Sequence, residues 1–386
     1  MQFFKLIIRN TFRQRLRTVL TIIGMAVAIL AFCLLSTVLE AWYTGVNSAS
    51  PNRLVTRNAV SLIMPLPLSY RTQILQVPGV NQVSYANWFG GIYIDERHFF
   101  PRLAIEPDHY FDVAPEMVIP SDELKAFRSQ RNACIVGRKL IDKYGWKLGD
   151  TITLTGNIYP GEWNFVLRGV YRGATKTVDE TAFFFNWNYL DEKVKKSALA
   201  TRAGKVGWYL IQIKDPSEAA QISASIDALF KNSWAETLTE TEKAFQAGFL
   251  AMMDAIVIAI RVVSYVVIGV ILVILANTMA MTSRERMPEY AILKTIGFGS
   301  KYLWMLIAGE SVFLSMLGGL CGIILSYPVA AVFSKGMSDF LPVFHIQWKT
   351  LVECALVSFG IGIASALLPI WRASHIRIAE ALGHVG

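Results

Sequence analysis

The chain has 386 residues, of which 53% are hydrophobic and 17% charged, and its mean hydropathy is +0.40. Soluble domains have about 25% charged residues, so this composition excludes a purely soluble protein. The formal net charge is +8, and its distribution along the chain, described below, indicates membrane topology and not nucleic-acid binding.

Residues 1–17 combine apolar and basic side chains at helical spacing. The apolar side chains are Phe3, Phe4, Leu6, Ile7, Ile8 and Phe12, and the basic ones among them are Lys5, Arg9 and Arg13. This pattern predicts an amphipathic helix that lies in the inner membrane interface beside anionic lipid. The alternative is a cytoplasmic extension of the first membrane-spanning helix.

Four long apolar runs follow, and the first, Thr18–Leu39, has 22 residues without a charge. It is longer than the apolar region of a usual signal peptide, and no small-x-small cleavage site follows it, so we expect an uncleaved anchor. About 20 helical residues cross the hydrocarbon core of a bilayer. The runs therefore predict transmembrane helices at 18–39, in the second half of 236–282, at 302–334 and at 349–371.

Residues 40–235 have the composition of an ordinary globular domain. Strand-like alternation or turn residues occur at 77–80, 151–154, 164–171 and 209–213, and helical patterns at 132–144 and 216–232. The aromatic residues expected in the core are Trp88, Phe89, Phe99, Phe100 and Phe183 to Phe185. The predicted fold class is a membrane α-helical protein with four transmembrane helices and an α+β extracytoplasmic domain inserted between helices 1 and 2.

Residues 236–282 contain no proline, and their pattern predicts one continuous helix. At 1.5 Å per residue this helix is on the order of 70 Å long, more than twice the ~30 Å hydrocarbon core. We expect its first part to form a rigid stalk and its second part to be the second transmembrane helix.

The charges of the short connecting segments predict the orientation. Residues 1–17, 283–301 and 372–386 carry 5, 4 and 2 Lys or Arg against 0, 2 and 1 acids, a net charge of +8 that equals that of the whole chain. By the positive-inside rule these segments face the cytoplasm, including both termini, and residues 335–348 form a short outer loop. The predicted location is the bacterial inner membrane, with several spans.

The loop at 283–301 contains a short predicted helix. Pro288 suits the first helical position, Glu289 the positive end of the helix dipole, Lys294 the last turn and Gly297 a left-handed cap. Its apolar side consists of Ile292, Leu293 and Ile296, with Tyr290 at the edge. Since so short a helix is marginal in water, either lipid headgroups or another protein must cover it.

Glu310 lies about 13 Å inside the third span, counted from the preceding lysine at 1.5 Å per residue. A carboxylate in a bilayer is costly unless it is paired or hydrated, so Glu310 should face protein or water. It could switch helix packing or form a fixed structural hydrogen bond. Gly318, Gly319 and Gly322 predict close helix packing, within one subunit rather than between subunits.

No catalytic constellation is present in the sequence. The five histidines lack metal-ligand spacing, no nucleophile motif occurs, and there is no G-x-x-x-x-G-K-[ST] nucleotide loop. We expect no catalytic, metal or cofactor-binding residues in this chain. Three of the four cysteines lie in apolar runs and only Cys134 lies in the soluble part, so no disulfide is expected.

Motifs along nearly the whole chain resemble those of the MacB-like (type VII, FtsX-related) ABC transporter permeases. The carrying residues are Asn277, Arg284 to Arg286, Glu289, Ala291, Leu293, Lys294, Ile296 and Gly297; Glu310, Gly318, Gly319 and Gly322; Pro369, Ala373 and Ala379 to Leu382; and, in the soluble part, Gly137, Leu140, Gly149 to Ile152 and Gly169 to Tyr171. One departure is Ile378, where the family usually has proline.

The resemblance implies that residues 40–235 are a periplasmic MacB-like core domain and that 283–301 carry a coupling helix that docks on a separate ATPase. The implied coupling residues are Arg284, Glu285, Arg286, Glu289, Tyr290, Ile292, Leu293, Lys294, Ile296 and Gly297. The implied function is mechanotransmission for export or extraction of a substrate, with ATP and Mg bound by the partner ATPase dimer. The alternative is an FtsX-like regulator of a cell-wall hydrolase.

The resemblance also implies several partners. These are a second permease copy, membrane lipids and, in the export branch, a periplasmic adaptor and an outer-membrane channel. No nucleic acid is expected.

Overall fold

The computed structural model describes residues 7, 9–251, 254–336 and 344–374. They form two compact units. Among the described residues, the bundle comprises those up to 41, 254–336 and 344–374, and the outer domain comprises 42–251.

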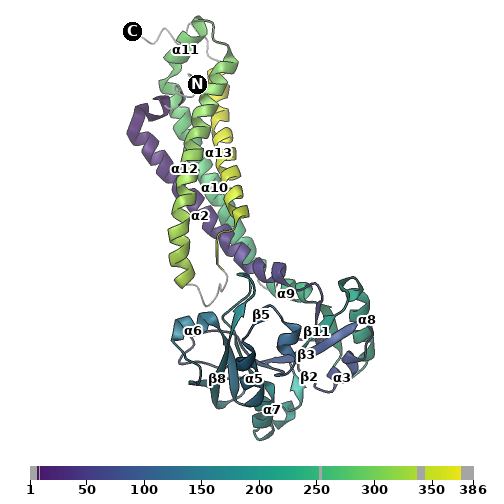
Figure 1. The fold of residues 1–386 in the computed structure, drawn as a ribbon. Helices are drawn as coiled ribbons and strands as arrows, with labels where there is room; N and C mark the ends of the chain where they lie inside the picture. The colour runs from purple at the N-terminus through teal and green to yellow at the C-terminus, as the bar shows by residue number, and fades with distance from the viewer. Residues whose placement is uncertain (1–6, 8, 252–253, 337–343, 375–386) are drawn as a thin grey trace. The chain divides into compact units, whose positions relative to one another are not determined.

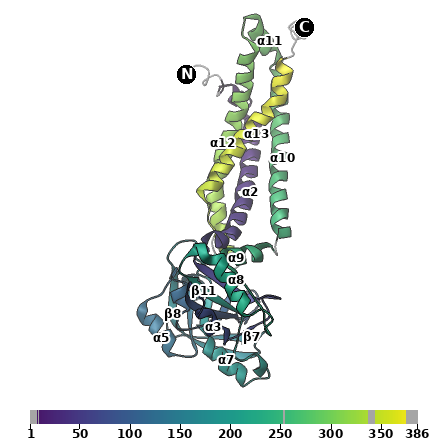
Figure 2. The same ribbon diagram turned by 90° about the vertical axis from the view of Figure 1, so that its right-hand side faces the viewer.

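The bundle is built from four long helices that lie side by side, with one short helix at one end (Figures 1 and 2). The long helices are α2 (Arg15–Ser48), α10 (Asp254–Glu285), α12 (Ser300–Gly336) and α13 (Trp348–Ser374). The short helix at the end is α11 (Met287–Thr295), and a 3-10 turn, η1 (Phe12–Gln14), precedes α2. Within the described residues, four helices are long and apolar enough to cross a membrane: Arg9–Tyr43, Ala255–Glu285, Ser300–Ser334 and Trp348–Arg372. They include all four predicted spans. A helix suits this role because it satisfies every backbone hydrogen bond internally.

The predicted glycine contacts occur inside the bundle. A Cβ on Gly318 would lie 2.6 Å from Met25 Cβ, and one on Gly322 would lie 2.6 Å from the Ala26 carbonyl oxygen of α2. A Cβ on Gly319 would lie 2.2 Å from Ser358 Oγ of α13. The three glycines therefore let α12 approach two neighbouring helices of the same chain, as predicted.

The segment before α2 packs on the bundle where it is described. Ile7 is buried and lies among the apolar side chains of the other helices, and Thr18 Oγ1 donates a hydrogen bond to the Thr11 carbonyl oxygen. The predicted amphipathic helix at 1–17 falls partly outside the described residues, as do Ile378 and Ala379 to Leu382 near the C-terminus.

The outer domain is an α+β unit, as predicted, around a ten-stranded mixed sheet. Its strands follow the order β12-β1-β11-β3-β4-β9-β6-β8-β5, and β7 pairs with β8. They are β1 (Arg53–Asn58), β3 (Val80–Trp88), β4 (Arg102–Ile105), β5 (Met117–Val118), β6 (Ala133–Gly137), β7 (Thr151–Gly156), β8 (Gly161–Gly173), β9 (Phe183–Asn186), β11 (Trp208–Ile213) and β12 (Thr237–Thr241). A separate pair consists of β2 (Leu66–Pro67) and β10 (Lys205–Val206).

Helices cover both faces of the sheet, so its strands are buried on each side. Phe183 and Phe185 of β9 belong to one apolar cluster and Phe184 to the other, as the period of two requires. The first cluster is covered by α3 (Tyr70–Leu75), α6 (Arg138–Tyr144), α7 (Trp187–Lys195) and α8 (Ala219–Leu229), the second by α4 (Tyr110–Val113), α5 (Ser121–Ser129) and α9 (Glu242–Ala251).

Two predictions for this domain were wrong in part. Residues 133–137 are strand β6 and only Arg138–Tyr144 is helical, because a short, wholly buried apolar run has no periodicity that separates strand from helix. The continuous helix predicted from 236 is interrupted as well: Thr237–Thr241 is strand β12, paired antiparallel with β1. Alternating threonines favour a strand, and the hydroxyls of Thr237 and Thr239 hydrogen-bond Asp227.

Candidate functional site

Helix α11 forms where the sequence predicted it. Pro288 and Glu289 lie in its first turn and Lys294 in its last. Gly297 has a φ of +100°, and the amide of Gly297 donates to the Lys294 carbonyl while that of Phe298 donates to the Leu293 carbonyl, at 3.1 and 3.0 Å. This pair of bonds is a Schellman cap. The residues at its two ends therefore specify where this helix begins and ends.

A buried ion pair joins the start of α11 to the first third of α12. Arg286, the residue that precedes α11, donates from Nη1 to Glu310 Oε2 at 2.8 Å, and their side chains are 8% and 4% exposed. Its Nη2 donates to the Asn10 carbonyl oxygen at 2.7 Å. A single guanidinium thus connects α11, α12 and the segment before α2.

In addition to this buried pair, two exposed ion pairs join the N-terminal segment to the same loop. Arg17 pairs with Glu285 through both nitrogens of its fork, at 2.8 and 3.0 Å, and Gln14 donates to the same carboxylate at 2.6 Å. Arg13 lies 2.5 Å from Glu289. Exposed pairs of this kind contribute about 0–1 kcal/mol each, so they orient the loop more than they stabilise the fold.

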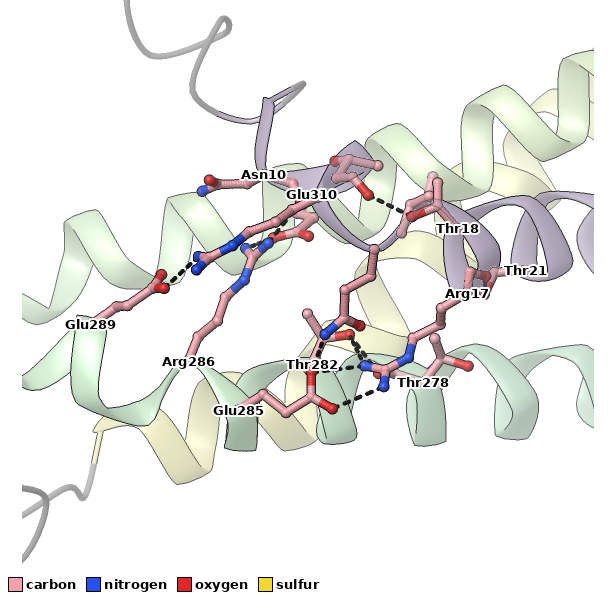
Figure 3. Close-up of a pocket in the computed structure, with 14 residues that line it drawn as sticks. Asn10, Arg17, Thr18, Thr21, Thr278, Thr282, Glu285, Arg286, Glu289 and Glu310 are labelled. Atoms are coloured by element: carbon pink, nitrogen blue, oxygen red, sulfur yellow. Dashed lines mark hydrogen bonds and ion pairs between the residues drawn. The ribbon is translucent and has the colours of Figure 1, made fainter. Parts of the chain in front are cut away.

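These side chains surround a small polar hollow of about 140 Å³, in which the arginines and carboxylates point toward one another (Figure 3). Its wall is completed by hydroxyls of Thr18 and Thr21 on α2 and of Thr278 and Thr282 on α10. Small-molecule sites usually have about 300–1,000 Å³, whereas one water occupies about 30 Å³. The hollow has the size for a few waters at the end of the bundle.

Two family profiles match the chain. The MacB-like periplasmic core domain matches residues 18–229, which is more than half of the chain, and the FtsX-like permease C-terminal domain matches residues 261–378. The chain belongs to the MacB/FtsX-like family of ABC transporter permeases. The resemblance seen in the sequence is thereby confirmed.

Named relatives agree with this family. An uncharacterised ABC transporter permease of Methanocaldococcus jannaschii is 24% identical over 97% of this chain and 96% of its own length. An uncharacterised ABC transporter permease of Mycobacterium tuberculosis is 25% identical over 64% of this chain, which spans only 28% of that protein. The macrolide export ATP-binding/permease protein MacB of Bdellovibrio bacteriovorus is 24% identical over 45% of this chain and 27% of its own length.

Among solved structures, the extracellular domain of the ABC-type transporter YknZ of Gram-positive bacteria covers 49% of this permease at 14% identity, with a TM-score of 0.36. A domain of a permease protein from Porphyromonas gingivalis covers 50% at 10% identity, with a TM-score of 0.35.

The structure separates the predicted coupling residues into buried and exposed sets. Tyr290 is 3% exposed and packs in the bundle core. Burial there raises the pKa of Tyr290 to about 12. Leu293 is half-buried against the same core. Ile292 and Ile296 are 49% and 69% exposed and, with Phe298, form what is called below the docking patch.

The remaining predicted residues lie around these two sets. Arg284 is exposed at the end of α10, Glu285 and Glu289 hold the N-terminal arginines, and Arg286 is buried on Glu310.

The partners of these acids could not be identified from local sequence patterns. The partners Asn10, Arg13, Gln14 and Arg17 lie more than 260 residues before the loop, and helical spacing predicted for that segment either an interfacial helix or an extension of the first span. The available signal was charge: both segments were placed on the same side of the membrane, one purely basic and the other containing acids.

Proposed function

We propose that this permease couples ATP hydrolysis on a separate ABC ATPase dimer to movement of its extracytoplasmic domain, for export or extraction of a substrate. The observation that carries the proposal is Arg286, which holds the start of α11 to Glu310 of α12 and to the Asn10 backbone at once. A push on α11 cannot leave α12 and the N-terminal segment in place without breaking a buried ion pair.

The docking patch gives the ATPase a surface to hold. Ile292 on this nine-residue helix, and Ile296 and Phe298 directly after its end, expose large apolar side chains. Helices of this length are marginal without packing, and a short apolar helix face is a common recognition element for a protein groove. Arg284 adds an exposed positive charge to the same loop, at the end of α10.

Chain connectivity supports transmission to the outer domain. Helix α2 continues to Ser48, five residues before strand β1 begins at Arg53. On the other side, β12 is followed directly by α9, and α10 begins at Asp254. Displacement of α2 or α10 therefore acts on two adjacent strands of one sheet, β1 and β12, which are hydrogen-bonded to each other.

In this proposal the chain itself carries out no catalytic reaction. ATP and Mg are bound by the partner ATPase, and the permease binds no cofactor. The sequence supports this division because it lacks the phosphate-binding loop of ATP-binding chains.

The proposed assembly contains a second copy of the permease. The most apolar 18-residue stretch of α10 is only 17% buried, less than that of the other three spans, and Asn277 on α10 is exposed beside the hollow between α2 and α10. A polar amide in a membrane helix favours a protein neighbour over lipid.

The proposed orientation places α11 and both termini in the cytoplasm of a bacterial inner membrane, as the positive-inside rule predicts. A periplasmic adaptor and an outer-membrane channel belong to the export version of the proposal. The match to the MacB-like core domain supports a transporter over a regulator of a cell-wall hydrolase.

Copurification tests the proposal. Tagged permease is extracted from its native cells, and the ABC ATPase retained with it is identified and quantified by mass spectrometry. Ile292→Glu and Ile296→Glu place a charge in the docking patch and should reduce the retained ATPase at least about tenfold, the effect of losing one strong interface contact. Leu148→Glu, at a 55% exposed position of the outer domain, is the matched control. Normal retention by both docking-patch variants would refute the docking role.

A further inference from the structure

A second hollow lies entirely within the outer domain, and the proposed coupling mechanism does not use it. We call it the outer cleft. Its volume is about 600 Å³, within the range of small-molecule sites. Its lining is mostly apolar, including Leu62, Ile63, Trp88, Phe99, Ile158 and Trp208.

The two aromatic residues at this cleft were expected in the core and are not. Trp88 and Phe99 are each 41% exposed and stack on each other with ring centroids 6.5 Å apart. Their sequence neighbours Phe89 and Phe100 are fully buried, as predicted. The domain therefore leaves a pair of large rings partly exposed to solvent beside the cleft, and grouped exposed apolar side chains are typical of a binding surface.

The loop that forms the adjacent rim is also apolar and exposed. Val60 and Ile63 are 78% and 92% exposed, and Leu62 and Met64 are 37% and 49% exposed. Burying a side chain of this size is favourable by about 1.5–3 kcal/mol. An apolar ligand in the cleft would therefore gain substantially from contact with this rim.

The charges of the outer cleft have one sign. Arg202 and Lys205 line it, and none of its lining residues is acidic. Arg202 is exposed and forms no salt bridge with any described residue, and Lys205 Nζ lies 4.6 Å from the ring centroid of Trp234. The acids Asp95 and Glu96 line a different, smaller hollow that shares Trp88 and Phe99 as a wall.

We infer that the outer cleft binds a single-chain anionic amphiphile of the fatty-acid class, with its tail against Trp88 and Phe99 and its carboxylate at Arg202 and Lys205. An apolar wall with two cations and no acid is complementary to this chemistry and disfavours a cationic ligand. The concave shape and volume favour a small molecule over the flat contact of a protein partner. The inference does not depend on the coupling mechanism.

Photolabelling of the purified full chain in nanodiscs tests this binding. The probe is palmitic acid with a diazirine on its chain, and its methyl ester is the neutral control. Peptide mapping should find the acid on residues 58–66 and 86–103, with labelling there about tenfold stronger than by the ester, the effect of one charge-assisted contact.

Variants assign the contacts. Arg202→Gln with Lys205→Gln should lower labelling by the acid to the level of the ester, whereas Arg172→Gln with Lys176→Gln, two exposed positions outside the cleft, should change nothing. Trp88→Ala should lower labelling by both probes. Thermal melting of each purified variant in detergent reports whether it is folded.

Three results would overturn the inference. They are labelling confined to the spanning helices, equal labelling of the outer cleft by acid and ester, and unchanged labelling in the Arg202 and Lys205 double variant. Crosslinking of Ile63→Cys to another protein chain would assign the cleft to a protein partner instead.

Discussion

Arg286 and Glu310 form an ion pair of 2.8 Å in which both side chains are less than a tenth exposed. The pair links the residue that precedes α11 to a residue ten positions after Ser300, the first residue of α12. Removing one partner from a buried pair costs about 3–5 kcal/mol, because the other charge stays buried without compensation.

A double-mutant cycle measures how much these two side chains stabilise each other. Glu310→Met and Arg286→Met should each lower thermal stability strongly in detergent, and the double variant should regain most of the loss. Additive losses in the double variant would show that the two residues do not interact.

Glu310→Gln tests whether the pair transmits motion. The amide still accepts a hydrogen bond from Arg286, so we expect the folded complex to form but substrate-coupled ATP turnover to fall. Copurified ATPase and turnover are measured on the same sample. Unchanged turnover would assign Glu310 to structure alone.

Leu293→Glu is expected to differ from the docking-patch variants. Leu293 is half-buried against the bundle core, so a charge there should lower the thermal stability of the permease as well as ATPase binding. Ile296→Glu, at a position 69% exposed, should affect only binding. Thermal melting of both variants without the ATPase distinguishes them; equal melting would place Leu293 on the surface.

Glycine positions predict which helix contacts are tight. Gly322→Ala places a Cβ 2.6 Å from the Ala26 carbonyl oxygen and should cost about 1–3 kcal/mol, since backbone cannot move aside cheaply. Gly360→Ala meets nothing within 4 Å and should be neutral or slightly stabilising. Melting temperatures in one detergent give the comparison, and equal destabilisation by both substitutions would contradict the packing of α12 on α2.

Asp179 gives the outer domain a pH dependence. Burial raises the pKa of its carboxyl above the ordinary value, despite hydrogen bonds from Thr181. The folded domain therefore binds this proton more tightly than the unfolded chain, and the contribution of Asp179 to stability falls as pH rises from the unfolded-state pKa through the raised folded-state pKa. Asp179→Asn should remove that fall. Hydrogen exchange of the peptide spanning 171–182 in the full chain, measured across this pH range, is the readout, and an unchanged pH dependence would exclude Asp179 as its source.

Features that depend only on neighbouring residues could be predicted from the sequence. Four uninterrupted apolar runs defined the spans, since length and apolarity alone let a helix cross a bilayer. Pro288, Glu289 and Gly297 defined α11, because residues at the two ends of a helix specify where it begins and ends. Glu310 could be recognised as a residue in need of a partner, but which partner it has could not.

Side-chain partners, burial and strand pairing between residues far apart in the chain became visible only in the folded structure. Arg286 is the partner of Glu310, and Tyr290 is buried, because the N-terminal segment, α11 and α12 meet at one end of the bundle. Thr237–Thr241 is a strand because β1, some 180 residues earlier, offers it a hydrogen-bonding edge. Trp88 and Phe99 are exposed while Phe89 and Phe100 are buried because only the assembled sheet determines which side of each aromatic pair faces the core. Local sequence patterns do not specify such pairings, because the contacts that stabilise them form only when the chain folds.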